Sequence, residues 1–139
     1  MKRVAVTGLG VISPVGNDVP TFWNALCSGT CGIGPITKFD ATDYPVKLAA
    51  EVRDFDPKQY MEKLDILHSD VYTHFAMAAA CQAVADSGIA GTLDAERVGV
   101  YIGSGIGGIA TFMTEHSKLL NRGPRRVSPY FIPMMIPNM

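Results

Sequence analysis

The sequence has no excess of charge of either sign and no long apolar run. Its 12 lysines and arginines nearly balance its 13 aspartates and glutamates, leaving a formal net charge of −1. A chain so close to neutral offers no electrostatic basis for binding nucleic acid or an anionic membrane. No apolar stretch approaches the roughly 20 residues that a membrane-spanning helix needs. We therefore expect neither nucleic acid nor a membrane among its partners.

Cysteine is scarce, with 3 residues in 139. An odd and small number argues against a disulfide framework and favours a reducing compartment, the cytoplasm or an organelle matrix. Cys81 falls within an alanine-rich stretch typical of a helix, where we expect a buried structural thiol rather than a nucleophile. Cys27 and Cys31 flank a Ser-Gly-Thr sequence that should end a helix, and two further metal ligands are missing. No metal site is expected.

Histidine is just as scarce, with 3 residues. His68, His74 and His116 are candidates for acid–base or metal chemistry. His68 and His74 do not have the spacing that places two residues on one helical face. His116 stands among charged neighbours, Glu115 and Lys118. We expect all three to be solvated surface histidines.

A complete dinucleotide-binding motif is missing as well. Gly8-Leu-Gly10 follows a β-branched run, but Ser13 occupies the third glycine position of G-x-G-x-x-G. The motif also needs a helix that opens at once, whereas here a helix should begin only near Pro20. A tight exit from a buried strand explains these glycines better, and no cofactor is expected.

Alternating strand and helix patterns are what the sequence does contain. With 47% hydrophobic and 18% charged residues, it has the composition of a globular chain. The expected elements follow from apolar periodicity and from the positions of glycine and proline. They are strands at 2–10, 46–52 and 98–102, helices at 20–28, 54–61, 69–86 and 109–120, and a loop at 29–45. Alternating strands and helices imply an α/β sandwich. The many alanines of 69–86 should let a neighbouring backbone approach closely.

The stretch from Arg122 to Pro133 is the most unusual part of the chain. Its cations lie beside an almost wholly apolar run, 130–136, which is punctuated by Pro129, Pro133 and Pro137. Because proline removes a backbone donor, it bars the middle of a helix and of a central strand. We expect an apolar wall that another surface covers, either a subunit interface, a pocket lining, or both.

Together with 4–16 (VAVTGLGVISPVG) and 98–108 (VGVYIGSGIGG), this stretch resembles the β-ketoacyl-acyl carrier protein synthases, most closely the type II condensing enzymes of fatty-acid synthesis. The resemblance spans residues 1–139. It implies an α/β fold, a thiolase-like layered αβαβα sandwich, of which the chain would be an incomplete N-terminal part of the first thiolase-like (ketosynthase N-terminal) domain. The family's nucleophilic cysteine and its two catalytic histidines would lie beyond Met139. We therefore expect no catalytic residue in the chain and no activity from the 139 residues alone.

The resemblance implies an acyltransferase, a β-ketoacyl-acyl carrier protein synthase of fatty-acid biosynthesis. Such an enzyme joins an acyl thioester to malonyl-carrier protein by decarboxylative Claisen condensation. Its partners would be acyl carrier protein, bearing acyl and malonyl groups, and a second copy of itself in a homodimer. The alternative is a non-catalytic, ketosynthase-like partner subunit of a polyketide condensing pair, which would lack the nucleophilic cysteine.

Ile106 is a lone bulky residue among glycines, in Gly105-Ile106-Gly107-Gly108. One reading is a strand-to-helix turn anchored by an isoleucine. The resemblance implies a second, in which Ile106 lines the acyl-chain channel while Phe131 and Ile132 reach that channel from the partner subunit. An alkyl substrate suits such apolar residues, because each buried methylene contributes about 0.8 kcal/mol.

The segment 63–72 departs from the family. Many relatives carry several basic residues here, which dock the acidic carrier protein, whereas this chain has one lysine and two aspartates in the run KLDILHSDVY. Carrier docking would then rest on Arg122, Arg125 and Arg126, or on residues beyond Met139. The same arginines could instead anchor a loop.

Overall fold

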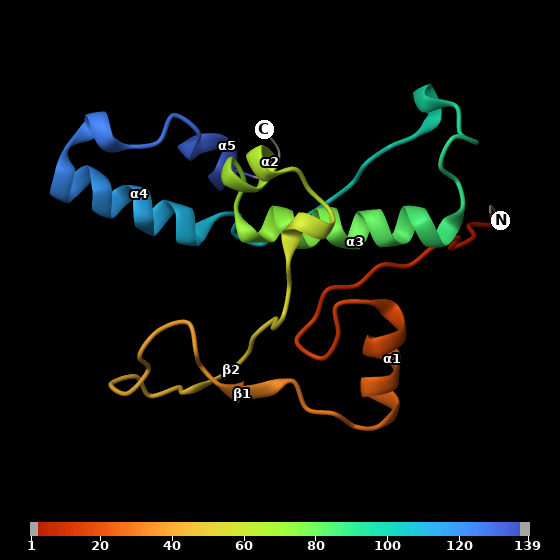
Figure 1. The fold of residues 1–139 in the computed structure, drawn as a ribbon, viewed down its shortest axis with the longest axis horizontal. Helices are drawn as coiled ribbons and strands as arrows, with labels where there is room; N and C mark the ends of the chain where they lie inside the picture. Colours follow the sequence, from red (N-terminus) through yellow and green to blue (C-terminus); the bar gives the residue numbers. More distant parts are fainter. Residues whose placement is uncertain (1–2, 137–139) are drawn as a thin grey trace. The chain divides into compact units, whose positions relative to one another are not determined.

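The computed structural model describes residues 3–136 of the chain (Figure 1). Its contacts form two compact units, one made of Met1–Asp56 and Ala79–Ala90, the other of Pro57–Ala78 and Gly91–Met139. The long helix α3, Val71–Ser87, supplies its first part to the second unit and its remaining turns to the first.

In the first unit, helix α1 spans Val19–Cys27 and its limits follow from local chemistry. The Asp18 carboxylate accepts a hydrogen bond from the Thr21 amide at 2.7 Å, which satisfies a donor that the first turn leaves free. Pro20 lies in that same turn, where its missing N–H costs nothing. Gly29 follows the helix with a φ of 68°. The predicted helix is confirmed at both ends.

A two-stranded antiparallel sheet follows, formed by β1, Ile33–Pro35, and β2, Leu48–Ala50. β2 was predicted, but β1 lies in a stretch that was expected to be a loop. Pro35 is tolerated there because it ends the strand. Beyond the sheet, the buried Glu51 carboxylate accepts hydrogen bonds from the Thr37 amide and hydroxyl, the hydroxyl at 2.6 Å. These bonds lower the pKa of Glu51, the hydroxyl bond most of all.

The N-terminal segment is not the predicted strand. Residue 2 lies outside the described part, and residues 3–10 have no regular secondary structure. Instead of a strand ladder, the amides of Leu9 and Val11 donate to the side chains of Asp86 and Gln82 on α3, at 2.9 and 3.1 Å. The two spacings match. Leu9 and Val11 are two residues apart in an extended chain, which rises about 6.6 Å, and Gln82 and Asp86 are four residues apart in a helix, which rises about 6 Å.

The second unit holds the remaining helices. These are the 3₁₀ turns η1 (Pro57–Gln59), η2 (Ala95–Arg97) and η3 (Pro124–Arg126), and the α-helices α2 (Lys63–Leu67), α4 (Ile109–Arg122) and α5 (Phe131–Met135). Figure 1 shows the chain leaving α4, turning at η3 and returning so that α5 lies at the beginning of α4. The predicted helix at 109–120 is confirmed, whereas the turn and short helix expected at 54–61 are reduced to the single 3₁₀ turn η1.

One prediction about this unit is wrong. Residues 98–102 form no strand, and Val100 and Tyr101 are almost fully exposed, because no neighbouring strand lies beside them in the described part of the chain. The apolar wall is partly helical, since α5 contains Pro133 at its third position. Proline is acceptable there because the first amides of a helix have no acceptor within it. Pro137 lies outside the described residues.

Apolar burial is slight throughout residues 3–136. Ala78 is the only buried apolar residue among them, while large side chains such as Val4, Trp23 and Leu120 are more than half exposed. Neither unit therefore encloses a hydrophobic core of ordinary size. No helix of the described residues is long and apolar enough to cross a membrane.

Candidate functional site

The loop that carries Ile106 is exposed from Gly103 to Ile106. The Gly107 amide donates to the Ser104 hydroxyl at 3.0 Å, and Gly107 has a φ of 76°, a conformation that favours glycine. A Cβ placed on Gly103 or Gly105 would meet no atom within 4 Å. Ile106 itself is 75% exposed. The loop is thus free to receive another surface, and Ile106 is the bulky apolar group that it would offer.

Gly108, which ends this loop, is tightly confined. Its amide donates to the Met135 carbonyl at 2.9 Å, so the loop is joined to the last residue of α5. A Cβ on Gly108 would lie 2.5 Å from the Met134 carbonyl oxygen and 2.8 Å from a carboxylate oxygen of Asp70. Only glycine fits between these two groups.

Phe131 and Ile132, the other predicted pocket residues, lie in the first turn of α5. The Phe131 ring is half-buried, with its centroid 6.1 Å from that of Phe112 on α4. Ile132 is 41% exposed. The structure therefore brings the backbone after Ile106 to the end of α5, while the Ile106 side chain remains uncovered.

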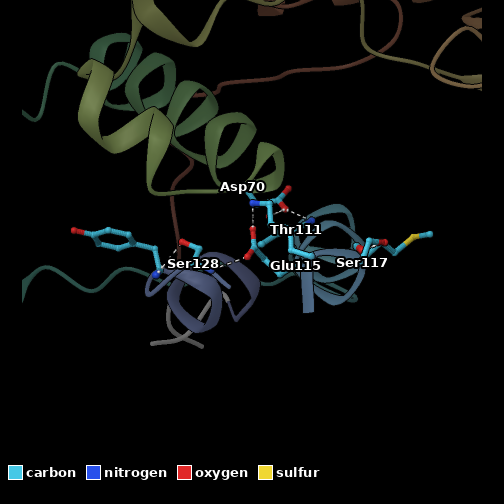
Figure 2. A network of polar contacts seen from close by, with 8 residues as sticks. Asp70, Thr111, Glu115, Ser117 and Ser128 are labelled. Carbon is cyan, nitrogen blue, oxygen red and sulfur yellow. Dashed lines mark hydrogen bonds and ion pairs between the residues drawn. The ribbon is translucent and has the colours of Figure 1, made fainter. Parts of the chain in front are cut away.

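Asp70 is a buried residue of this region for which the sequence predicted no role here. Asp70 directly precedes α3, and one oxygen of its carboxylate accepts from the Val71 amide at 2.6 Å. Its other carboxylate oxygen accepts from the Thr111 amide at 3.2 Å and from the Thr111 hydroxyl (Figure 2). Thr111 lies in the first turn of α4, whose own capping position is Gly108, which has no side chain. Asp70 thus caps two helices at once.

Glu115 secures the returning segment to α4. Its carboxylate is 5% exposed and accepts from the Lys118 ammonium at 2.5 Å and from the Ser128 amide at 2.7 Å (Figure 2). The hydrogen bond from Lys118, with that from Ser128 second, lowers the pKa of Glu115 below its ordinary value. Glu115 thereby fixes the segment that leads from η3 to α5.

The histidines do not all match the prediction. His74 is 8% exposed rather than solvated, and its Nε2 lies 3.2 Å from the Ile66 carbonyl and 3.1 Å from the Ser69 hydroxyl. The half-buried His68 ring stacks on Tyr130, with centroids 3.8 Å apart. His116 is exposed, as expected. His74 thus connects α3 to α2, and His68 connects the end of α2 to the residue before α5. Residues 3–136 contain no group of three or more His, Cys, Asp or Glu side chains placed to hold a metal ion.

The cysteines are all exposed in the described chain. This corrects the prediction for Cys81, whose alanine-rich helix presents it to solvent rather than to a packed layer. Helix α1 ends at Cys27, so the predicted break before Cys31 is confirmed.

The surface around α2 has no dominant charge. An open depression of about 630 Å³ is lined by Lys58 but also by Glu62 and Asp65. Arg122, Arg125 and Arg126 are exposed around the turn between α4 and η3, as a docking surface would require.

Known proteins resemble this chain along its whole length. It is 50% identical over 139 residues to 3-oxoacyl-[acyl-carrier-protein] synthase 2 of Coxiella burnetii, covering 99% of this chain and 34% of that protein. Proteins of the same name from Staphylococcus aureus and Synechocystis are each 45% identical, again with 99% of this chain covered and 34% and 33% of theirs. The chain thus spans about a third of the length of the curated relatives it matches.

Solved structures share the fold. The ishigamide ketosynthase/chain length factor matches with a TM-score of 0.76 at 28% identity, over 94% of this chain and 33% of that one. A ketosynthase in complex with its type II polyketide synthase acyl-carrier protein matches with a TM-score of 0.77 at 26% identity, over 95% and 36%. The predicted thiolase-like α/β fold is confirmed. Since residues 1–139 also match the family described as Beta-ketoacyl synthase, N-terminal domain, this chain belongs to the β-ketoacyl synthase family.

Proposed function

We propose that this chain is the N-terminal part of a β-ketoacyl-acyl carrier protein synthase of fatty-acid biosynthesis, acting as a homodimer in the cytoplasm or an organelle matrix. The observation that carries the proposal is the unbroken similarity of 45–50% identity to three bacterial 3-oxoacyl-[acyl-carrier-protein] synthases 2. The reaction is a decarboxylative Claisen condensation between an acyl thioester and malonyl-carrier protein.

In this reaction the acyl group first passes to a cysteine thiol, and the carrier protein leaves with a free thiol. Loss of CO₂ from the malonyl group then yields a carbanion that attacks the acyl thioester and releases the cysteine. Two histidines stabilise the negative charge on the thioester oxygen. The family resemblance assigns none of these three groups to the described residues, which would serve the acyl chain rather than the bond-making step.

The role proposed for this part of the chain is to form a wall of the acyl pocket. The Ile106 side chain is exposed in a loop of glycines, and the Ile132 side chain is partly exposed on α5. Both are apolar, as an alkyl substrate requires. In the homodimer, Phe131 and Ile132 would reach the channel of the partner subunit.

The second candidate is a non-catalytic subunit of a polyketide condensing pair. It is favoured by one observation, the match to the ishigamide ketosynthase/chain length factor, but at 28% identity against 50% for the fatty-acid enzyme. The two candidates differ at the nucleophile position.

One experiment separates them. The protein is purified as its source produces it, its intact mass is measured, and condensation of acyl- with malonyl-carrier protein is followed by product mass. A longer protein with turnover that iodoacetamide abolishes supports the synthase. A longer protein that is inactive alone, yet restores condensation in a mixture with an active ketosynthase subunit, supports the partner subunit instead.

A further inference from the structure

Three segments of the second unit meet at the carboxylate of Asp70. Asp70 directly precedes α3, Thr111 lies in the first turn of α4, and Gly108 joins the Ile106 loop to the end of α5. Figure 2 shows Asp70 directed at Thr111, with the two connected by dashed lines. Asp70 thus lies where the two parts of the proposed acyl-pocket wall come together.

The geometry around Gly108 leaves little freedom. On one side is the Asp70 carboxylate, on the other the Met134 and Met135 backbone, and a Cβ on Gly108 would lie within 3.1 Å of each of them. The Gly108 amide is already engaged by the Met135 carbonyl at 2.9 Å. Movement of the Asp70 side chain therefore changes the space in which Gly108 is held.

The Asp70 side chain is buried and hydrogen-bonded, as expected of a residue that holds other segments in position. It is 9% exposed, and its hydrogen bonds in the described structure come from the amides of Val71 and Thr111 and from the Thr111 hydroxyl. Lys118 lines the same cavity of about 330 Å³, but its ammonium bonds to Glu115. The Asp70 carboxylate is therefore the hydrogen-bond acceptor for the N-terminal end of α4.

We propose that Asp70 is a specificity-determining positioning residue, which sets the position of the Ile106 loop relative to α5 and thereby the acyl length that the pocket accepts. The inference rests on the proposed function of the wall. Ile106 lies two residues before Gly108, whose amide bonds to Met135, and Phe131 and Ile132 belong to α5, the short helix that ends at Met135. A shift at Asp70 moves both parts of the wall without touching the reacting atoms.

The test uses the protein as its source produces it, with the variants Asp70→Ala, Asp70→Asn and Thr111→Val. Asp43→Asn is the matched control, because Asp43 is an exposed loop aspartate that undergoes the same loss of charge. Two quantities are measured: amide hydrogen exchange of peptides covering 105–112, and kcat/KM for acyl-carrier proteins of increasing chain length.

We expect Asp70→Ala to accelerate exchange in this peptide and to change the ratio of long-chain to short-chain kcat/KM by roughly tenfold or more, since a misplacement of about 1 Å can cost 100-fold. Asp70→Asn should restore much of both properties, because an amide oxygen can still accept the cap bond. Thr111→Val should change both in the same direction by less. The control should change neither.

Accelerated exchange with an unchanged length ratio would reduce Asp70 to a purely structural residue and overturn the proposal, and so would no change in either quantity. If Asp70→Ala does not fold, Thr111→Val, which loses only the hydroxyl donor, decides by the same criteria. A wild-type protein without condensing activity refutes the proposed function and the length effect with it. The exchange measurements still report, independently, whether Asp70 holds the loop.

Discussion

Gly10 is packed directly against the backbone of Ala79 in helix α3. A Cβ on Gly10 would lie 2.8 Å from the Ala79 carbonyl carbon, and closer still to its oxygen. Gly8 lies in the same way against the following two turns of α3, where its Cβ would meet the Ala83 carbonyl oxygen and would lie 2.7 Å from the Ser87 amide nitrogen. The two glycines and the small side chains of α3 thus allow an extended segment to lie on a helix at backbone contact distance.

Gly10→Ala is therefore expected to destabilise the protein by about 1–3 kcal/mol, the usual cost of overpacking, because the new methyl group meets backbone atoms that cannot turn away. The measurement is urea denaturation of the protein as its source produces it. Gly99→Ala is the matched control, since a Cβ there meets nothing within 4 Å, and it should change stability by less than about 0.5 kcal/mol. Equal stability of the Gly10 variant and the wild type would contradict the observed packing.

The 139-residue chain alone should have no condensing activity. Its three cysteines are exposed, and none lies at a helix N-terminus beside a histidine that could activate it. The purified chain is incubated with acyl- and malonyl-carrier protein, and β-ketoacyl product is followed by mass. Turnover above that of a reaction without enzyme would refute this prediction.

The same chain should not form a stable monomer. Ala78 is the only buried apolar residue among residues 3–136, and Tyr130 and Ile132 are among many large apolar side chains left partly exposed. Folding without a core cannot offset the loss of conformational entropy. Sedimentation and urea denaturation test this, and a monomer with a single sharp transition would prove the prediction wrong.

In the protein as its source produces it, Ile106→Phe should shorten the accepted acyl chain while preserving transfer of short acyl groups. A phenyl ring at position 106 would fill volume that the distal methylenes of a long acyl chain need. Binding of the longer substrates should then be weakened by about 1–3 kcal/mol. Initial rates against acyl length provide the measurement. Phe131→Ala should alter the same profile and also weaken the dimer, which sedimentation reports. An unchanged profile in a folded Ile106 variant would leave Ile106 with only a structural role.

Glu115 should make stability depend on pH. Because its folded-state pKa is lowered, chiefly by Lys118, its contribution is present above the unfolded-state pKa, about 4.3, and is lost as the pH falls through the folded-state value. Glu115→Gln should therefore lower Tm at pH 7, and its deficit should shrink as the solution is acidified toward about pH 3. Glu62→Gln, at an exposed position without a capping bond, serves as the control. A deficit that grows with acidification would reverse the assigned sign.

Elements whose causes are local could be predicted from the residues alone. Helix α1 begins at the Asp18 cap and ends before Gly29, because capping and left-handed glycine depend on residues a few positions apart. The family resemblance was also readable, since it rests on three short stretches in the right order. The strands were predicted less well than the helices, because a strand forms only where another strand lies beside it. Residues 98–102 have a strand pattern but no such neighbour among the described residues.

The long-range partners of the polar side chains depend on the folded arrangement of the chain. Asp70 caps α4 from 41 residues away, and Leu9 finds its acceptor on Asp86 at a separation of 77 residues. A sequence pattern can mark Asp70 as a helix cap, because that role is local. It cannot show which second helix needs the remaining carboxylate oxygen, because that need arises only when Gly108 leaves the start of α4 without a capping side chain and folding brings the two helix ends together.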